Sequence, residues 1–413
     1  MFRRTTSALV GRVTPVLRCS AAAGWSIPTP CTLLTEEELM LQKTVRDFAL
    51  THVAPRSIKM DEAQKIDKEV IDEAFKAGLM GIETPSELQG SGMSFFSSIL
   101  AIEELARIDA AVSVMVDVQN TLVNNIFFRY ANEEQRAKYL PRLAQDTVGC
   151  FCLTEPSSGS DAFALKTRAE KKGDTYVING SKIYITNGGE ANIFLVMATV
   201  DSSKGYKGIT CFIVDGNEHK GVKVGRRENK LGIRASSTVE LNFDNVVVPA
   251  ANVVNEVGKG YKIAIEVLNE GRIGIGAQMV GIAQGAMDAA MPYLFQRKQF
   301  NTLIGDFQGM QFQFAQAQME LHAARLMVYN AARKKVHGQP FVEDAAMAKL
   351  FASQVAEKTA SKAVEWLGGV GFTKEYHVER FYRDAKIGAI YEGTTNIQLH
   401  TLAKFVKDRY VSK

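Results

Sequence analysis

The spacing of apolar residues along the chain changes twice, and these changes divide the chain into three parts. Over residues 35–145 apolar side chains recur every three to four positions, as on one face of an α-helix. Over residues 146–255 the period falls to two, in short segments rich in Val, Ile and aromatic residues, as in β-strands. Helical spacing returns over residues 256–413. The pattern therefore predicts an α+β protein with a helical domain, a β domain and a second helical domain.

Two capping signals mark helix starts in the first domain. In Thr35-Glu36-Glu37-Glu38 the hydroxyl can accept from a free backbone N–H while Glu38 reaches back, and this helix should end before Pro55. Asn132 and Gln135 have the same spacing, and their helix is expected to stop near Pro141. In the last domain the long amphipathic segments predict a four-helix bundle: 258–298, 307–336, 342–367 and 395–409.

The middle domain is predicted to be an antiparallel β-barrel or sandwich. Asn179-Gly180 separates two of its strand segments, and this dipeptide tolerates the positive φ angles of a tight hairpin. Antiparallel pairing follows from such a hairpin. The expected strands are Gly149–Leu153, Thr175–Ile178, Lys182–Ile185, Ile193–Val200, Ile209–Val214 and Thr238–Val248.

Composition agrees with a soluble globular protein. Hydrophobic residues make up 46% and charged residues 23% of the 413 positions, and no apolar run is long enough to span a bilayer. Five cysteines are few and unpatterned, and the alternation of Cys150 and Cys152 places both thiols on one face of a strand. They are expected to be packed core thiols and not zinc ligands.

The first 35 residues differ from the rest because they contain four arginines and no acidic residue. Such an Arg-rich, Ser-containing, acid-poor segment is typical of a mitochondrial transit peptide, which we predict over residues 1–30, with the mature protein in the matrix. The formal net charge of +4 equals the charge of those arginines, so 4 − 4 = 0 remains for the rest of the chain. The basic balance therefore does not predict binding to nucleic acid.

Common catalytic signatures are missing from the sequence. It contains no Gly-x-x-x-x-Gly-Lys loop, no His-Glu-x-x-His, no Gly-x-Ser-x-Gly and no Gly-x-Gly-x-x-Gly after a strand, and its six histidines are scattered. These absences disfavour phosphoryl transfer, triad hydrolysis and zinc chemistry, and no metal site is predicted. They do not exclude a flavin, because FAD can bind at domain junctions without a dinucleotide fingerprint.

Three polar or glycine-rich clusters are candidates for chemistry. Residues 154–161 follow a strand and would let a flat or phosphorylated ligand approach the backbone, although they also suit an ordinary polar turn. Residues 368–371 are a weak phosphate cradle, because glycine also ends helices. Glu392 precedes a turn whose Thr395 or Asn396 would cap the last helix, and apolar neighbours would raise its basicity. Taken alone, Glu392 is better described as an exposed loop glutamate.

In this order the clusters resemble the acyl-CoA dehydrogenase family, and within it the short/branched-chain subgroup. The subgroup resemblance rests on residues 228–237 and 383–388. The family resemblance extends from about residue 36 to the C-terminus. Its motifs are Phe151–Pro156 with Gly159–Asp161, Tyr184–Asn187, Asn269–Arg272, Arg297–Phe300, Trp366–Gly369 and Tyr391–Thr394.

The resemblance implies a helical–β–helical fold, a homotetramer, FAD and an acyl-CoA substrate, with electrons passed to electron-transferring flavoprotein. It implies a catalytic base at Glu392 that removes the α-proton, with its own backbone amide in the oxyanion hole and Arg272 tuning local charge. The implied FAD contacts are Phe151, Leu153, Thr154, Gly159, Ser160, Tyr184, Ile185, Thr186, Arg297, Gln308, Glu365, Trp366, Leu367, Gly368, Gly369, Thr394, Thr395 and Asn396. The implied substrate contacts are Ser160, Tyr206, Tyr261, Asn269, Glu270, Gly271 and Arg272.

One subgroup difference can be read from the sequence. In isovaleryl-type and long-chain relatives the base precedes the arginine of the Asn269–Arg272 motif, and here that position is Gly271. The resemblance therefore favours Glu392 as the base, with Glu270 as the local rival. Three alternatives remain: a 2-methyl-branched enoyl-CoA reductase using the same site, an acyl-CoA-binding protein without activity, and an acyl-CoA oxidase.

Overall fold

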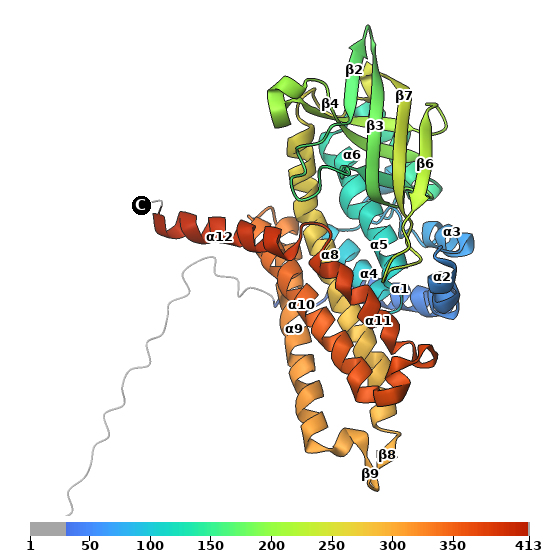
Figure 1. The fold of residues 1–413 in the computed structure, drawn as a ribbon, viewed down its shortest axis with the longest axis vertical. Coiled ribbons are helices and arrows are strands. Elements are labelled where there is room, and N and C mark those ends of the chain that lie inside the picture. The colour runs from blue at the N-terminus through green and yellow to red at the C-terminus, as the bar shows by residue number, and fades with distance from the viewer. Residues whose placement is uncertain (1–29, 412–413) are drawn as a thin grey trace, which may run out of the picture.

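The computed structural model describes residues 30–411, which form a β domain joined to one end of a long helical body (Figure 1). The predicted targeting segment, residues 1–30, lies outside the described residues except for its last position. The α-helices of the N-terminal part are α1 (Glu36–Phe48), α2 (Ser57–Ala63), α3 (Lys68–Lys76), α4 (Phe95–Ala106), α5 (Ala110–Asp117), α6 (Asn125–Tyr130) and α7 (Glu133–Gln145). Two π-helical segments, η1 (Ala49–Val53) and η4 (Val118–Asn124), interrupt them.

Both predicted capping boxes are present. The Glu38 backbone N–H donates to Thr35 Oγ1 at 3.2 Å, and the Thr35 N–H donates to Glu38 at 3.0 Å. Asn132 and Gln135 cap α7 in the same way. The predicted stop near Pro141 is wrong, because α7 continues through this proline to Gln145. Proline removes one helical hydrogen bond, and the buried face of α7 packs well enough to tolerate that loss.

The β domain contains one curled sheet, with strand order β1-β4-β2-β3-β7-β6 and β5 paired to β4. Its antiparallel character is only partly as predicted, because β1 pairs with β4 in parallel. The long chain segment between these two strands allows the crossover that parallel pairing requires. The strands are β1 (Gly149–Cys152), β2 (Arg168–Lys172), β3 (Thr175–Thr186), β4 (Ile193–Thr199), β5 (Ile209–Asp215), β6 (Val222–Arg227) and β7 (Thr238–Pro249).

The predicted hairpin at Asn179-Gly180 is wrong. Strand β3 runs through this dipeptide, and its register against β7 shifts there, as in a β-bulge. A Cβ at Gly180 would lie 2.3 Å from the hydroxyl of Thr167. The glycine is therefore required because the two chain segments approach each other closely here. The tight turn lies earlier, between β2 and β3, where Gly173 has a φ of +57°.

Alternation along the strands decides which side chains face the helices. Every residue of β4 is buried; Leu195 belongs to the core shared with the helices, and Val196 belongs to the interior of the β domain. In β1 the thiols of Cys150 and Cys152 lie 3.6 Å apart in that interior, as predicted. Phe151 therefore points in the opposite direction, toward the helical body.

The C-terminal part is built on three long helices, α8 (Gly260–Leu294), α9 (Gln308–Val336) and α10 (Val342–Leu367). The short α11 (Val378–Ala385) packs on α8 and α10. The hairpin of β8 (Lys298–Gln299) and β9 (Thr302–Leu303) lies at the end far from the β domain (Figure 1).

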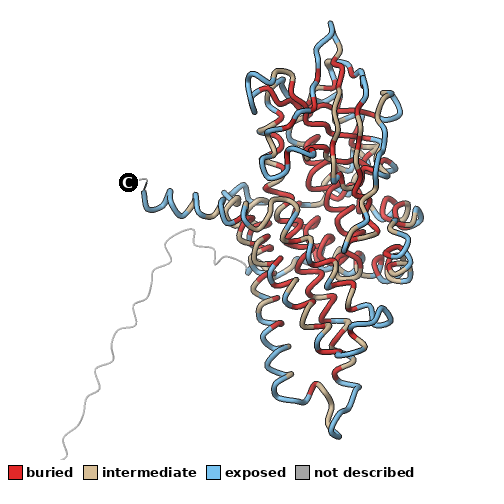
Figure 2. The backbone as a smooth tube through the Cα atoms, in the orientation of Figure 1, coloured by how far each residue is buried: buried red, intermediate tan, exposed pale blue. Residues whose placement is uncertain are grey.

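The last helix, α12 (Thr395–Val411), does not complete the predicted four-helix bundle along its length. It projects sideways from the body, and among its described residues only Gln398 is buried (Figures 1 and 2). Between residues 30 and 411, each helix is either too short or too polar to cross a bilayer.

Candidate active site

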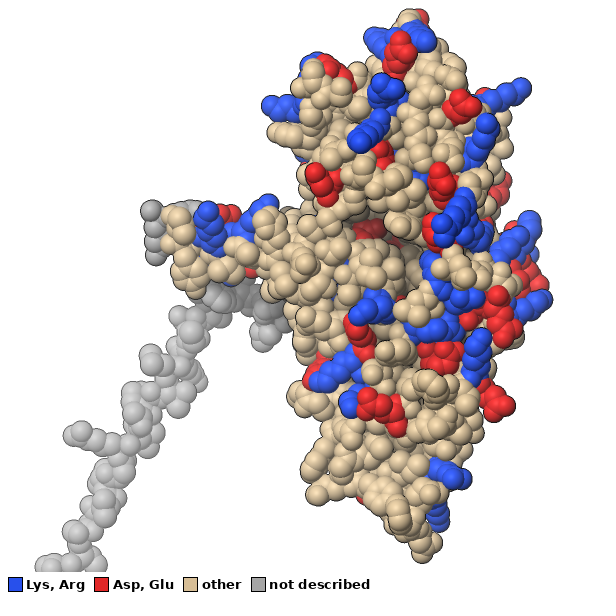
Figure 3. Space-filling model, in the orientation of Figure 1, with Lys and Arg blue, Asp and Glu red and all other residues tan. Residues whose placement is uncertain are grey.

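A cavity of about 880 Å³ lies between the β domain and the helical body. Figure 3 shows the surface hollowed at this junction. Its walls come from β1 and the loop that follows it, from the end of β3, from η4 and α8, and from the segment between α11 and α12. Within residues 30–411 no group of three or more His, Cys, Asp or Glu side chains is arranged to hold a metal ion.

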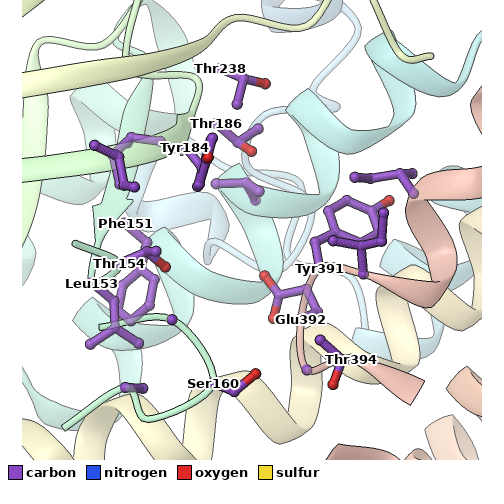
Figure 4. A pocket seen from close by; sticks show the side chains of 18 of the residues that line it. Phe151, Leu153, Thr154, Ser160, Tyr184, Thr186, Thr238, Tyr391, Glu392 and Thr394 are labelled. Atoms are coloured by element: carbon purple, nitrogen blue, oxygen red, sulfur yellow. The ribbon is translucent and has the colours of Figure 1, made fainter. Parts of the chain in front are cut away.

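Glu392 stands on the turn between the short 3-10 helix η10 (Lys386–Ala389) and α12. Its φ is +52° and that of Gly393 is +89°, so two successive residues adopt left-handed conformations that turn the chain sharply. The carboxylate points into the cavity, facing Phe151, Leu153 and Thr154 on the β side (Figure 4). A glutamate held with strained backbone in a cavity is a candidate functional residue.

The Glu392 carboxylate is enclosed but not satisfied. Its Oε2 atom is buried and has no hydrogen-bond partner among the described residues. Burial raises the pKa of Glu392 to about 7, although the positive charges of Lys349 and Arg272 oppose the rise. A carboxylate that titrates near neutral pH and faces open space is suited to accept a proton.

Hydrogen bonds to two backbone carbonyls hold the turn around Glu392. The carbonyl of Gly393 accepts from Lys349 Nζ at 2.8 Å and from Gln398 Nε2 at 2.9 Å. The carbonyl of Glu392 accepts from the same Gln398 amide at 3.1 Å. The predicted caps at Thr395 and Asn396 are wrong, because Thr394 Oγ1 accepts from the Ile397 N–H and caps α12.

Helix α8 forms the wall beside Glu392. A Cβ at Gly271 would lie 2.9 Å from Glu392 Oε2, so a glycine at this position leaves the room that the carboxylate occupies. Arg272 lines the cavity and donates to Asn269 Oδ1 at 2.8 Å, and its buried Nε has no partner within residues 30–411. Asn269 thus acts on Arg272 and is not itself among the lining residues.

Glu270 lies outside the cavity lining, contrary to its prediction as a substrate contact. It is buried on another face of α8, where Asn125 Nδ2 donates to it at 2.6 Å. Arg129 and Lys335 form ion pairs with it, the latter at 3.3 Å. With its oxygens committed to these groups, Glu270 is a poor rival to Glu392 as a base.

The β wall brings together the residues predicted after β1 and at the end of β3. The loop after β1 is shaped by Glu155, which pairs with the buried Lys182 at 2.7 Å and accepts from the N–H groups of Lys166 and Thr167. Tyr184 has a φ of +57° and is 60% exposed. The predicted residues lining this wall are Phe151, Leu153, Thr154, Gly159, Ser160, Tyr184, Ile185 and Thr186.

Thr394 also lines the cavity, whereas the remaining predicted contacts lie outside the lining of this chain. Tyr206 stacks edge-on against Tyr261 at 4.7 Å between ring centroids, and Tyr261 meets Phe163, which does line the cavity. Tyr261 therefore lies directly behind a lining residue, and Tyr206 lies beyond Tyr261. The other predicted FAD contacts outside the lining are Arg297, Gln308, Glu365, Trp366, Leu367, Gly368, Gly369, Thr395 and Asn396.

Several lining residues were not predicted. Val118 and Leu122 come from the π-helix η4, and apolar periodicity cannot distinguish this element from an α-helix. Residues 228–233 and Arg383 also line the cavity. They lie in the two segments that resemble the short/branched-chain subgroup, so that signal could have identified them.

Comparison with known protein families assigns the chain to a class. The N-terminal, middle and C-terminal domain models of acyl-CoA dehydrogenase match residues 35–147, 150–246 and 258–407. The chain belongs to the acyl-CoA dehydrogenase family, which is a family of oxidoreductases. This confirms the predicted α+β class with its helical, β and helical domains.

Individual relatives show which members of the family the chain is similar to. The chain is 54% identical over 381 residues to the mitochondrial short/branched chain specific acyl-CoA dehydrogenase of Rattus norvegicus, covering 92% of this chain and 88% of the relative. Butyryl-CoA dehydrogenase from Megasphaera elsdenii has a TM-score of 0.88 at 43% identity, covering 91% of this chain and 99% of that one. A third similar chain comes from a solved structure described as the electron transferring flavoprotein of Acidaminococcus fermentans. It has a TM-score of 0.89 at 41% identity, covering 91% of this chain and 99% of that one.

Proposed function

We propose that this protein is an FAD-dependent dehydrogenase that converts short, 2-methyl-branched acyl-CoA thioesters to 2-enoyl-CoA. The observation that carries the proposal is the carboxylate of Glu392, which faces the β wall across the cavity and whose buried Oε2 atom has no partner among the described residues. Membership of the acyl-CoA dehydrogenase family and the 54% identity to a short/branched chain specific relative support this choice of reaction and substrate.

The residues of the β wall fit a flavin. Phe151 and Tyr184 offer flat apolar surfaces, and the hydroxyls of Thr154 and Thr186 can bond to polar ring edges. FAD, when bound there, supplies the acceptor for the β-hydride. A volume of about 880 Å³ is within the range of ligand pockets and leaves room beside the ring for an acyl chain.

Glu392 then takes the α-proton of the thioester. The C–H bond at Cα breaks to the carboxylate, the hydride at Cβ leaves with its electron pair, and the carbon–carbon double bond forms. Arg272 and Lys349 keep positive charge near Glu392, which favours its ionised form before the proton arrives. Enclosure of the carboxylate excludes water, which strengthens these interactions.

Apolar residues around Glu392 support a short acyl group. Val118 and Leu122 of η4 and Leu268 of α8 line the cavity on the helical side, together with Tyr391. The hydroxyl of Tyr391 donates to Gln278, so its ring has a fixed position. Packed side chains of this kind limit chain length because overfilling such a pocket is costly.

A homotetramer is proposed because the predicted FAD site is incomplete within one chain. Arg297, Gln308 and Gly368 are exposed and lie outside the cavity lining, so a second copy would supply them to the adenosine half of FAD. Large apolar side chains are exposed on the same helical part, with Phe300 at 93% and Phe312 at 65%. Exposed apolar surface of this kind marks protein interfaces.

Electron-transferring flavoprotein in the mitochondrial matrix is the proposed electron acceptor. The structural similarity to a chain from work on an electron transferring flavoprotein supports this partner. The mitochondrial relative from rat supports the location, as does the arginine-rich composition of the first 35 residues.

Anaerobic titration of the purified holoenzyme tests the proposal. The protein should carry oxidised flavin, and 2-methylbutyryl-CoA should bleach its visible absorbance, whereas palmitoyl-CoA should bleach it much more slowly. Absence of flavin, or flavin that no short acyl-CoA reduces, would exclude this function. Faster turnover in the direction of enoyl-CoA reduction, with a reduced electron donor, would reverse the proposed direction.

A further inference from the structure

Lys349 is a buried lysine beneath the turn that carries Glu392. It lies in α10, is only 1% exposed and does not line the cavity. Removing an ammonium group from water is unfavourable unless a nearby anion or strong acceptor compensates. Burial accordingly lowers the pKa of Lys349 to about 8, while the charge of Glu392 opposes that fall.

The Lys349 ammonium has one hydrogen bond among the described residues, to the carbonyl of Gly393 at 2.8 Å. That carbonyl already accepts from Gln398 Nε2 at 2.9 Å. A neutral amide therefore contributes to the same task, and the hydrogen bond alone does not explain a buried positive charge. What Lys349 adds beyond Gln398 is the charge itself.

Few charged groups face Glu392 from the elements packed around its turn. Arg272 approaches from α8 and Lys349 from α10. Asp117, at the end of α5, is also buried, and burial together with the charge of Glu392 raises its pKa well above its usual value. Asp117 accepts a hydrogen bond from the hydroxyl of Thr121 at 2.9 Å. The phenol of Tyr391 completes the set, and it too has a raised pKa.

We propose that Lys349 is a positioning residue for proton abstraction, fixing the turn through Gly393 and supplying the charge that keeps Glu392 ionised when substrate arrives. The proposal rests on the proposed dehydrogenase function, because it assigns Lys349 a part in that reaction. Lys349 acts from behind the turn, without touching the substrate. Arg272 lines the cavity directly, so the two cations approach Glu392 from different elements.

The test is the pH dependence of kcat/KM for flavin reduction by 2-methylbutyryl-CoA in Lys349→Met and Lys349→Gln holoenzymes. Methionine preserves much of the side-chain length and removes both charge and donor, whereas glutamine retains a donor. Loss of the charge should move the acid limb of the pH profile to higher pH by about one unit, which lowers kcat/KM about tenfold at pH 6. Wild type and variants should converge near pH 9, because Lys349 itself loses its proton at about pH 8.

Lys358→Met is the matched control, because it removes an exposed lysine of α10 that pairs with Glu320. Its acid limb should coincide with that of the wild type. Flavin absorbance and thermal unfolding of each variant verify folding, and Lys349→Gln keeps the test decisive if Lys349→Met does not fold. An unshifted acid limb in Lys349→Gln, or a uniform loss at every pH, would overturn the charge role. A wild type that no acyl-CoA reduces would instead refute the proposed function.

Discussion

Glu270 and Glu392, two glutamates that lie next to Gly271, illustrate opposite uses of burial. Glu270 is surrounded by Asn125, Arg129 and Lys335, and its oxygens are engaged by these groups. Glu392 is only partly buried as a residue, but its Oε2 atom is buried and has no partner among the described residues, on a backbone with a φ of +52°. Both carboxyls have a raised pKa, with burial as the largest cause. The direction of a pKa shift therefore does not separate a structural carboxylate from a candidate base.

The free oxygen is what distinguishes the two regions. Around Glu270, side chains from α6, α8 and α9 meet, and their opposite charges join the N-terminal and C-terminal helices. Around Glu392 the cations stop short of a direct ion pair, and the hydrogen bonds go to the carbonyls of the turn instead of the carboxylate. The first region holds helices together, and the second leaves a carboxylate oxygen free for the proposed proton transfer.

The largest effect is expected for Glu392→Gln. Loss of the base should slow flavin reduction by 2-methylbutyryl-CoA by about a thousandfold or more, as measured by anaerobic stopped flow. FAD content should remain normal, because the substitution changes one atom of the carboxylate. Glu270→Gln is the matched control and should stay within a few-fold of the wild-type rate. If Glu270→Gln proved the slower of the two, the assignment of roles would have to be exchanged.

The next effect concerns stability against pH. The pKa of Glu392 is raised to about 7 in the folded protein, so its proton favours the folded state. That contribution is complete below pH 4.5 and is lost as the pH rises through 7. Relative to Glu392→Gln, the wild type should therefore lose up to about 3 kcal/mol between pH 4.5 and 8, as measured by urea unfolding. Parallel stability curves for the two proteins would contradict the raised pKa.

A smaller loss of stability is expected for Glu270→Gln. Removal of one partner from a buried ion pair leaves the remaining charges uncompensated, which costs about 3–5 kcal/mol for fully buried pairs. Because Arg129 is 37% exposed and can be solvated, we expect about 2 kcal/mol, as a lower denaturant midpoint with an unchanged m value. Glu266→Gln, which also removes a partner of Arg129 but at a more exposed position, should cost less. Equal costs would mean that burial of Glu270 is unimportant.

The smallest effect is expected for Gly271→Ala. The new methyl group would lie 2.9 Å from Glu392 Oε2, so the carboxylate must shift by a few tenths of an ångström. Misplacing a base by this amount should lower kcat about tenfold while leaving the fold intact, because alanine favours helix. Gly309→Ala is the control, since nothing lies within 4 Å of its added Cβ. Unchanged kcat in Gly271→Ala would mean that the carboxylate can use other space.

The order of domains and the helix starts could be predicted because they depend on local patterns. Capping at Thr35 and Asn132 needs residues only three positions apart. The hairpin predicted at Asn179-Gly180 does not form, because a distant contact with Thr167 determines the local conformation. Strand β2 was missed because four of its five residues are exposed, so it lacks the alternation that reveals a strand.

Site residues that belong to family motifs could be predicted from the sequence, whereas residues that reach the site only through packing could not. The motifs indicated Glu392 and the β wall, but nothing local to Lys349 distinguishes it from the surface lysines of α10. Its role depends on a contact 44 residues away in sequence. The sequence around Gln398 likewise gives no sign of its role, although it is the one described residue of α12 that is buried. Such partners appear only when the helices are placed in space.

Gly271 also constrains how this family could have diversified. The volume between α8 and the turn holds one carboxylate, since even a Cβ at 271 meets Glu392 Oε2. A lineage that moved its acidic group from one chain position to the other would pass either through a protein with two colliding carboxylates or through one with none. The first intermediate is crowded and the second has no carboxylate at either position. Single substitutions are therefore expected to link the two arrangements only through enzymes of lowered activity, which favours retention of the inherited arrangement.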